Sequence, residues 1–172
     1  MKLRIELPKL ELPDGAEIRG LIEEVRQLYE EVAYYLDDDQ VERFPGYFVD
    51  DCMYQVVSRE NYAEHLPQAA IFCDGLDMVH DRVTALRETQ VFVPRTWRHQ
   101  ISAVRITRVE ADAIHASANF IVTECMSNVE PAIHLVGQYI SSLVRRDGRL
   151  KFKQHLAVYD NYRVMRSLIV PV

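Results

Sequence analysis

Four long segments of strand-forming character follow Pro94 and occupy the second half of the chain. They cover residues 97–109, 112–126, 132–146 and 149–160. In the second segment apolar and polar residues alternate with the period of two that marks a strand with one buried face. Asp147-Gly148 separates the last two segments and predicts a two-residue hairpin, because both residues tolerate a positive φ. The pattern therefore predicts a sheet of long antiparallel strands.

A helical pattern precedes these strands. Over residues 16–36 the apolar residues recur at steps of three and four, which predicts an amphipathic helix. The run Asp37-Asp38-Asp39 is predicted to end this helix and to cap a short second one, which Pro45-Gly46 stops. We interpret the acidic run as a cap and solvated loop rather than as a metal site. The remaining elements are predicted as a strand over 51–58, a polar irregular stretch over 59–73 and a helix over 75–88 that Asp74 caps.

Helices followed by a run of hairpin-connected strands indicate the α+β class. The apolar face of the first long strand shifts between Ile101 and Val104, and a β-bulge that bends the sheet explains this shift. A curved, mainly antiparallel sheet wrapped on the long N-terminal helix gives a cone open at one end, the NTF2-like or cystatin-like architecture. We predict a single domain over 16–172. Residues 1–15 are predicted as an extended arm, which either lies on a neighbouring subunit or frays.

Charge and composition exclude several classes of function. The formal net charge is −6 and no cluster of Lys and Arg appears, which argues against a nucleic-acid surface. No apolar stretch approaches the roughly 18 residues of a membrane span, and the N-terminus has no apolar signal-peptide core. The 3 cysteines are far apart and odd in number, which fits a reducing compartment. We therefore expect a cytoplasmic protein without a membrane or nucleic-acid partner.

The histidines and cysteines do not have the spacing of an iron site. A Rieske centre needs two Cys and two His in closely spaced pairs, and a mononuclear iron site needs two His and a carboxylate. The 6 histidines are widely spaced along the chain, and no Cys lies beside a His. The sequence also lacks a G-x-G phosphate loop. We expect no metal, cofactor or nucleotide site in this chain.

Cone-shaped domains often hold an acid–base pocket at their open end, which makes titratable residues candidates. His99 shares the parity of Trp97 and Ile101 along its strand, so it is predicted to face the interior. The candidate catalytic residues are His99, Asp81, Tyr54, His134 and His155. Each candidate also has a non-catalytic interpretation. His99 could be a core residue or lie at a subunit contact, and Asp81 could form an ion pair. The aromatic residues could fill the gap between the helix and the sheet instead of lining a pocket. These aromatic residues are Tyr29, Tyr35, Phe44, Tyr47, Phe48 and Tyr54.

Several segments together resemble the β subunits of Rieske-type aromatic-ring-hydroxylating dioxygenases. They are LDDDQVERFPGYFVDDCMYQVVSRENY, DGLDMVHDRVTALRE, RTWRHQIS, SANFIV and the tail AVYDNYRVMRSLIVPV. The likeness spans about residue 20 to Val172 and rests on the order and spacing of these pieces. The segment YAEHLPQAAIFCDGLDM resembles most the branch that acts on benzoate-like arenes such as terephthalate, anthranilate or salicylate.

This resemblance implies a non-catalytic chain. The Rieske [2Fe–2S] cluster and the mononuclear iron would lie in a larger α subunit, in an assembly of three α and three β chains. A reductase would bring electrons from a nicotinamide cofactor, and the holoenzyme would add both atoms of O₂ to an arene. We also expect the chain to form a trimer. Residues predicted to anchor subunit contacts are Trp97, Arg98, Tyr139 and Arg163.

Two other functions stay open on the sequence. One is a stand-alone isomerase, cyclase or dehydratase, similar to SnoaL or ketosteroid isomerase, with His99, Asp81 and Tyr54 around a pocket. The other is a plain binding module for a small apolar ligand. An apolar cavity that contains a general base would favour the first, and a cavity without one would favour the second.

Overall fold

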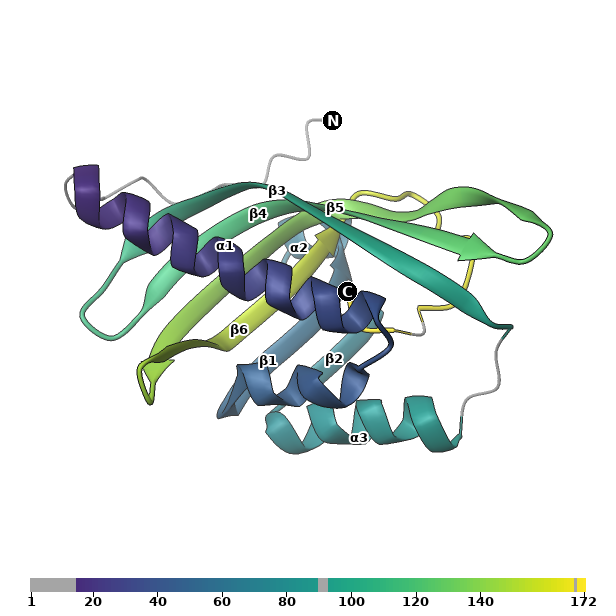
Figure 1. The fold of residues 1–172 in the computed structure, drawn as a ribbon, viewed down its shortest axis with the longest axis horizontal. Coiled ribbons are helices and arrows are strands. Elements are labelled where there is room, and N and C mark those ends of the chain that lie inside the picture. Colours follow the sequence, from purple (N-terminus) through teal and green to yellow (C-terminus); the bar gives the residue numbers. More distant parts are fainter. Residues whose placement is uncertain (1–14, 90–92, 169) are drawn as a thin grey trace.

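A long helix packed on a six-stranded sheet forms the body of the molecule, as the computed structural model of residues 15–89, 93–168 and 170–172 shows (Figure 1). The helices are α1 (Gly15–Asp37), η1 (Val41–Tyr47), α2 (Arg59–Ala63) and α3 (Leu76–Glu88). The strands are β1 (Phe48–Ser58), β2 (Ile71–Asp74), β3 (Arg95–Val109), β4 (Ile114–Met126), β5 (Val129–Arg146) and β6 (Arg149–Tyr159). None of the helices within these ranges is long and apolar enough to cross a membrane.

The strand order is β2-β1-β6-β5-β4-β3, in which β1 and β6 run parallel and every other neighbouring pair is antiparallel. This confirms the α+β class and the NTF2-like cone, with a mainly antiparallel sheet. The two halves of the sequence meet at the β1–β6 pair, which joins the first strand to the last. The predicted arm over 1–15 lies outside the described residues except for Gly15, which begins α1.

A β-bulge and a two-residue hairpin turn shape the sheet, and both were predicted. The register of β3 against β4 shifts between Ser102 and Arg105, and Ala103 between them has a φ of 51°. This is the β-bulge predicted between Ile101 and Val104. At the tip of β5 and β6, Asp147 and Gly148 have φ values of 50° and 77°. The two-residue hairpin is therefore confirmed.

The polar stretch 59–73 was predicted to be irregular, and this is wrong at its two ends, whereas 64–70 has neither helix nor strand. Ser58 caps α2 by accepting a hydrogen bond from the backbone N–H of Asn61. The last residues of the stretch belong to β2, which pairs antiparallel with β1. The helix capped by Asp74 is also corrected: Gly75 is the N-cap of α3, with a φ of 95° and no side-chain cap bond.

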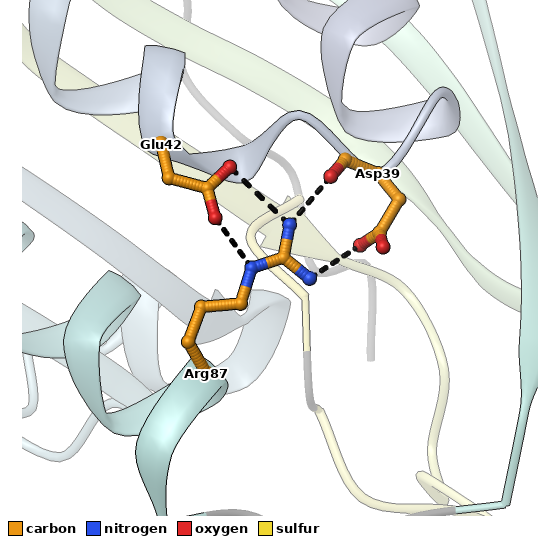
Figure 2. A network of polar contacts seen from close by, with 3 residues as sticks. All are labelled: Asp39, Glu42 and Arg87. Atoms are coloured by element: carbon orange, nitrogen blue, oxygen red, sulfur yellow. Dashed lines mark hydrogen bonds and ion pairs between the residues drawn. The ribbon is translucent and has the colours of Figure 1, made fainter.

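The acidic run at the end of α1 is solvent-exposed at Asp38 and Asp39, as predicted, but it also takes protein partners. Figure 2 shows the guanidinium of Arg87, on α3, held between Asp39 and Glu42. The Nε of Arg87 lies 2.5 Å from Glu42 Oε1, and its Nη1 lies 2.9 Å from Asp39 Oδ1. Hydrogen bonding to Arg87 lowers the pKa of Glu42. This network ties α3 to the junction between α1 and η1. Pro45 and Gly46 lie inside η1 rather than after it.

Candidate functional site

Aromatic rings fill the space between α1 and the sheet. His155 is at the centre of this cluster, with its ring centroid 4.2 Å from that of Phe152, 4.8 Å from Tyr139 and 5.9 Å from Tyr54. The predicted filling role is confirmed for four side chains that are at most 2% exposed: Tyr29, Phe44, Phe48 and Tyr54. Tyr35 and Tyr47 are only partly buried.

A chain of hydroxyls satisfies His155 inside this cluster. The Tyr29 hydroxyl donates to Ser141 Oγ over 2.8 Å, and Ser141 Oγ lies 2.9 Å from His155 Nδ1. Because the Ser141 oxygen accepts from Tyr29, its own hydrogen is free to be donated to Nδ1 of a neutral imidazole. Burial lowers the pKa of His155 to about 3, so the ring stays neutral near pH 7. His155 is therefore a hydrogen-bonded core residue and not a free base.

His99 faces the interior, as predicted, and is paired with the last residue of α1. The backbone N–H of His99 lies 3.1 Å from both carboxylate oxygens of Asp37, and His99 Nδ1 lies 2.7 Å from Asp37 Oδ1. The His99 side chain is 1% exposed, and its Nε2 has no hydrogen-bond partner among the described residues. An imidazole that a carboxylate orients in this way is chemically suited to hydrogen bonding or proton transfer at its other ring nitrogen, here Nε2.

The other two residues predicted beside His99 lie elsewhere. Asp81 is exposed on α3. Tyr54 is fully buried, and its hydroxyl oxygen accepts a hydrogen bond of 2.9 Å from the backbone N–H of Val172. From the sequence, Asp37 was predicted only to end the first helix and cap the next one. Its direction toward the interior could have been predicted, because Asp37 follows the buried Ala33 by four residues and so shares its helix face.

A second charged group lies on β4 opposite Trp97, and no pattern in the sequence singles it out. Glu124 is buried on β4, with Arg95 Nη1 2.5 Å from one carboxylate oxygen and Arg166 on the other. Burial alone would raise the pKa of Glu124, but hydrogen bonds from Arg166 and Arg95 hold that pKa below its usual value. His134, whose ring centroid is 5.0 Å from that of Trp97, is buried nearby, and burial lowers its pKa.

The residues after β6 form a C-terminal strap, defined here as 160–168 and 170–172. Asn161 anchors its start, by accepting from the backbone N–H of Val136 at 3.0 Å. Further along, the Arg82 guanidinium donates to the backbone oxygen of Leu168 at 2.6 Å. Val170 and Val172 then enter the hydrophobic core. The strap thus contributes its own side chains to the filling of the cone.

The four predicted interface anchors divide into two pairs. Trp97 and Tyr139 are 6% and 4% exposed within this chain, so their side chains leave little surface for a contact with another subunit. Tyr139 instead stacks on Phe120, with a centroid distance of 4.5 Å. Arg98 and Arg163 are exposed, and their interface role stays a prediction.

A large hollow lined by described residues lies outside the aromatic cluster. It is an open cleft of about 850 Å³ between α1, η1 and the β5–β6 hairpin. Its wall carries both acidic and basic side chains, including Glu31, Arg43 and Lys151. Across residues 15–89, 93–168 and 170–172, no three His, Cys, Asp or Glu side chains gather into a possible metal site.

Comparison with known proteins gives a consistent result. A family model for a SnoaL-like domain matches residues 20–155. The chain is 32% identical over 149 residues to the anthranilate 1,2-dioxygenase small subunit of Burkholderia cepacia, covering 87% of this chain and 92% of that protein. It is also 32% identical over 126 residues to the terephthalate 1,2-dioxygenase terminal oxygenase component subunit beta 1 of Comamonas sp., covering 73% and 82%.

A solved structure agrees with these relatives. It is described as the β subunit of an aromatic-ring-hydroxylating dioxygenase from Novosphingobium aromaticivorans. Its TM-score is 0.81 at 33% identity, and the match covers 90% of this chain and 98% of that one.

Proposed function

Because the chain belongs to the SnoaL-like family and, within it, to the β subunits of aromatic-ring-hydroxylating dioxygenases, we propose that it is the structural, non-catalytic β subunit of a multicomponent dioxygenase. It assembles with a larger α subunit, and the holoenzyme dihydroxylates a small benzoate-like arene in aromatic compound catabolism. The choice of arene class is supported by the names of the relatives, which are subunits of anthranilate and terephthalate dioxygenases.

The observation that supports a non-catalytic role is the filled space between α1 and the sheet. A general acid or base within a cone acts on a substrate that lies beside it, and this requires a chamber of substrate size. Here the rings around His155 and the side chains of Val170 and Val172 occupy that region. The same packing counts against the alternative of a stand-alone isomerase, cyclase or dehydratase.

The side chains present do not fit the two iron centres of such a holoenzyme. Thiolate and imidazole ligands must converge to hold a Rieske cluster, and two His and a carboxylate must converge to hold mononuclear iron. Cys52 and Cys73 are buried, and His155 already bonds Ser141. We therefore assign both centres to the α subunit, and derive no step through them in this chain.

Reconstitution tests the proposal. We expect the α subunit and this chain, mixed with the reductase and a reduced nicotinamide cofactor as the electron donor, to consume O₂ with anthranilate, terephthalate or benzoate and to form a cis-dihydrodiol or the catechol derived from it. Naphthalene, which has no carboxylate, serves as the matched apolar arene. Stoichiometric iron or arene turnover in this chain alone would overturn the non-catalytic assignment. Full turnover with naphthalene but none with carboxylated arenes would overturn the substrate class.

The subunit contacts are tested separately. We propose an assembly of three α and three β chains, in which the exposed Arg98 and Arg163 contribute to contacts. Arg98→Ala and Arg163→Ala should weaken co-purification with the α subunit. Arg26→Ala removes an exposed arginine on α1 instead, and it should leave co-purification with the α subunit unchanged. Native mass spectrometry reports the stoichiometry of the assembly. If neither Arg98→Ala nor Arg163→Ala weakens the assembly, these two residues do not contribute to the interface.

A further inference from the structure

A basic cluster occupies the hairpin that joins β5 and β6, in a chain whose formal net charge is −6. The basic cluster is defined here as Arg146, Arg149 and Lys151. The two arginines are exposed and the lysine is half-buried. Within the described ranges no carboxylate forms an ion pair with any of the three, whereas the neighbouring Arg145 pairs with Glu24. The positive charge of the basic cluster is therefore not neutralised by those parts of the chain.

The register of the hairpin sets two of these charges against each other. Arg146 on β5 lies directly opposite Arg149 on β6, and like charges in this position destabilise an antiparallel pair. Asp147, at the turn between them, is exposed and forms no ion pair with a described residue. Asp51, on the neighbouring β1, is bound by Lys153 instead. The fold gains nothing from this repulsion, and an anionic group from outside the described residues would relieve it.

The basic cluster borders the open cleft of about 850 Å³ between α1, η1 and the hairpin, and Arg149 and Lys151 are part of its lining. Apolar side chains line the same cleft, among them Leu28, Leu76 and Leu150. A hollow of this size accommodates several amino-acid residues rather than a single small anion. The cleft therefore combines apolar surface with positive charge that has no partner on the described residues.

The acidic side chains of the cleft do not cancel this charge. Glu24 and Glu42 are each paired with an arginine of the chain. Glu31 accepts a hydrogen bond from the hydroxyl of Tyr47. Asp50 is exposed, and it forms no ion pair within the part of the chain that the structure describes. The surplus charge at the hairpin end of the cleft is therefore positive.

The spacing of the cations suits an extended peptide. Arg149 and Lys151 are alternate residues of β6, so their side chains leave the same face of the strand about 7 Å apart. Alternate residues of an extended peptide have the same spacing and also share a face. Two carboxylates at alternate positions can therefore meet both cations at once, and a guanidinium binds a carboxylate through two parallel N–H bonds.

We propose that the basic cluster and the adjoining cleft form a docking site for an extended acidic segment of a partner protein. Carboxylates at alternate positions of the segment bind Arg149 and Lys151, and Arg146 adds its charge beside them. Apolar side chains of the segment pack on Leu76 and Leu150. The site goes beyond the proposed function, because it recognises its peptide without the α subunit.

Fluorescence anisotropy with the full-length chain tests the site. The probe is a fluorescein-labelled peptide in which glutamate and serine alternate between two terminal leucines. We expect saturable binding that weakens as salt is added, because salt screens exposed charges. An isomer of the peptide with adjacent glutamates should bind severalfold more weakly. Arg149→Ala and Lys151→Ala should each weaken binding about fivefold. Arg105→Ala removes an exposed arginine from β3 and is the matched control, which should bind as the native chain does.

Equal binding of the two peptide isomers would overturn the proposal, as would equal affinities of the Arg149→Ala and Arg105→Ala chains. Tripolyphosphate or a single-stranded oligonucleotide that binds as tightly as the peptide would overturn the assignment to a protein segment. Thermal unfolding separates binding from stability. Because Arg149→Ala relieves the repulsion with Arg146, its melting temperature should not fall. A lower melting temperature would show that Arg149 serves the fold, and would contradict the docking role.

Discussion

The hydroxyl of Tyr29, on α1, donates a hydrogen bond of 2.8 Å to Ser141 on β5, which joins residues 112 positions apart in the chain. Ser141 in turn contacts His155 on β6, so one serine oxygen links the helix to two neighbouring strands. All three side chains are buried. This connection fixes the rotation of α1 over the sheet more specifically than apolar packing alone, because a hydrogen bond has a narrow geometry.

The first prediction compares the two ends of this connection. Tyr29→Phe removes one donor but leaves Ser141 bonded to His155, so we expect a loss of about 1 kcal/mol in the free energy of unfolding. Ser141→Ala leaves both the Tyr29 hydroxyl and His155 Nδ1 buried without a partner, and should be more destabilising, by about 2–4 kcal/mol. Tyr34→Phe, at a 63% exposed position of the same helix, is the control. Urea unfolding measures all three, and equal effects of the first two variants would contradict the linkage.

The second prediction concerns the pH dependence of stability. Burial lowers the pKa of His155 from 6.5 to about 3 in the folded chain, so between these values the unfolded chain binds a proton that the folded chain does not. Stability must therefore fall as pH falls, and this one group contributes a loss of about 2 kcal/mol between pH 7 and pH 5. His155→Gln keeps an acceptor for Ser141 but removes the titration. The native chain should lose about 2 kcal/mol more than His155→Gln over this interval in urea titrations, and parallel losses would show that His155 is not the group responsible.

The sequence predicted those parts of the fold that local chemistry determines. Alternation along 112–126 is a property of the strand itself, and the turn at Asp147 and Gly148 depends only on backbone preferences. Both were therefore readable without tertiary information. The inward direction of His99 followed for the same reason, because parity along a strand sets its face.

What the sequence could not supply was the pairing of distant residues. The four residues of β2 carry too little pattern to be recognised alone, and they form a strand because β1 offers an edge to pair with. Asp37 was predicted to be a cap because its partner, His99, is 62 positions away. Tyr139 was predicted to be a surface anchor from its residue type, although its parity on β5 places it against Phe120.

The third prediction tests the closest backbone approach in the sheet. A Cβ added to Gly137 on β5 would lie 2.1 Å from the backbone oxygen of Val158 and 2.9 Å from Cζ of Phe120. Because one of these obstacles is backbone, Gly137→Ala should destabilise the chain by at least about 3 kcal/mol. Gly20→Ala is the matched control, since Gly20 lies in α1 with open space around it. It should stabilise the helix by up to about 1 kcal/mol. Thermal unfolding that ranks the two variants equally would contradict the register of β5 and β6.

The fourth prediction separates a buried ion pair from an exposed one. Glu124→Gln would leave the guanidinium of Arg95, which is 9% exposed, without a charged partner, so we expect a loss of about 3–5 kcal/mol. Glu24→Gln breaks the pair with Arg145, in which both side chains are more than a third exposed, and should change stability by less than about 1 kcal/mol.

The pH dependence of the same variant provides an independent check. Because the folded-state pKa of Glu124 is lowered, its contribution is present above the unfolded pKa and is lost as pH falls through the folded one. Removing the carboxylate should therefore cost most near pH 7, and the native chain and Glu124→Gln should converge in stability as the pH is lowered below about 4. Guanidinium chloride would screen these charges, so urea is the denaturant of choice. A difference between the two chains that stays constant from pH 7 to pH 3 would show that Glu124 acts through packing and not through its charge.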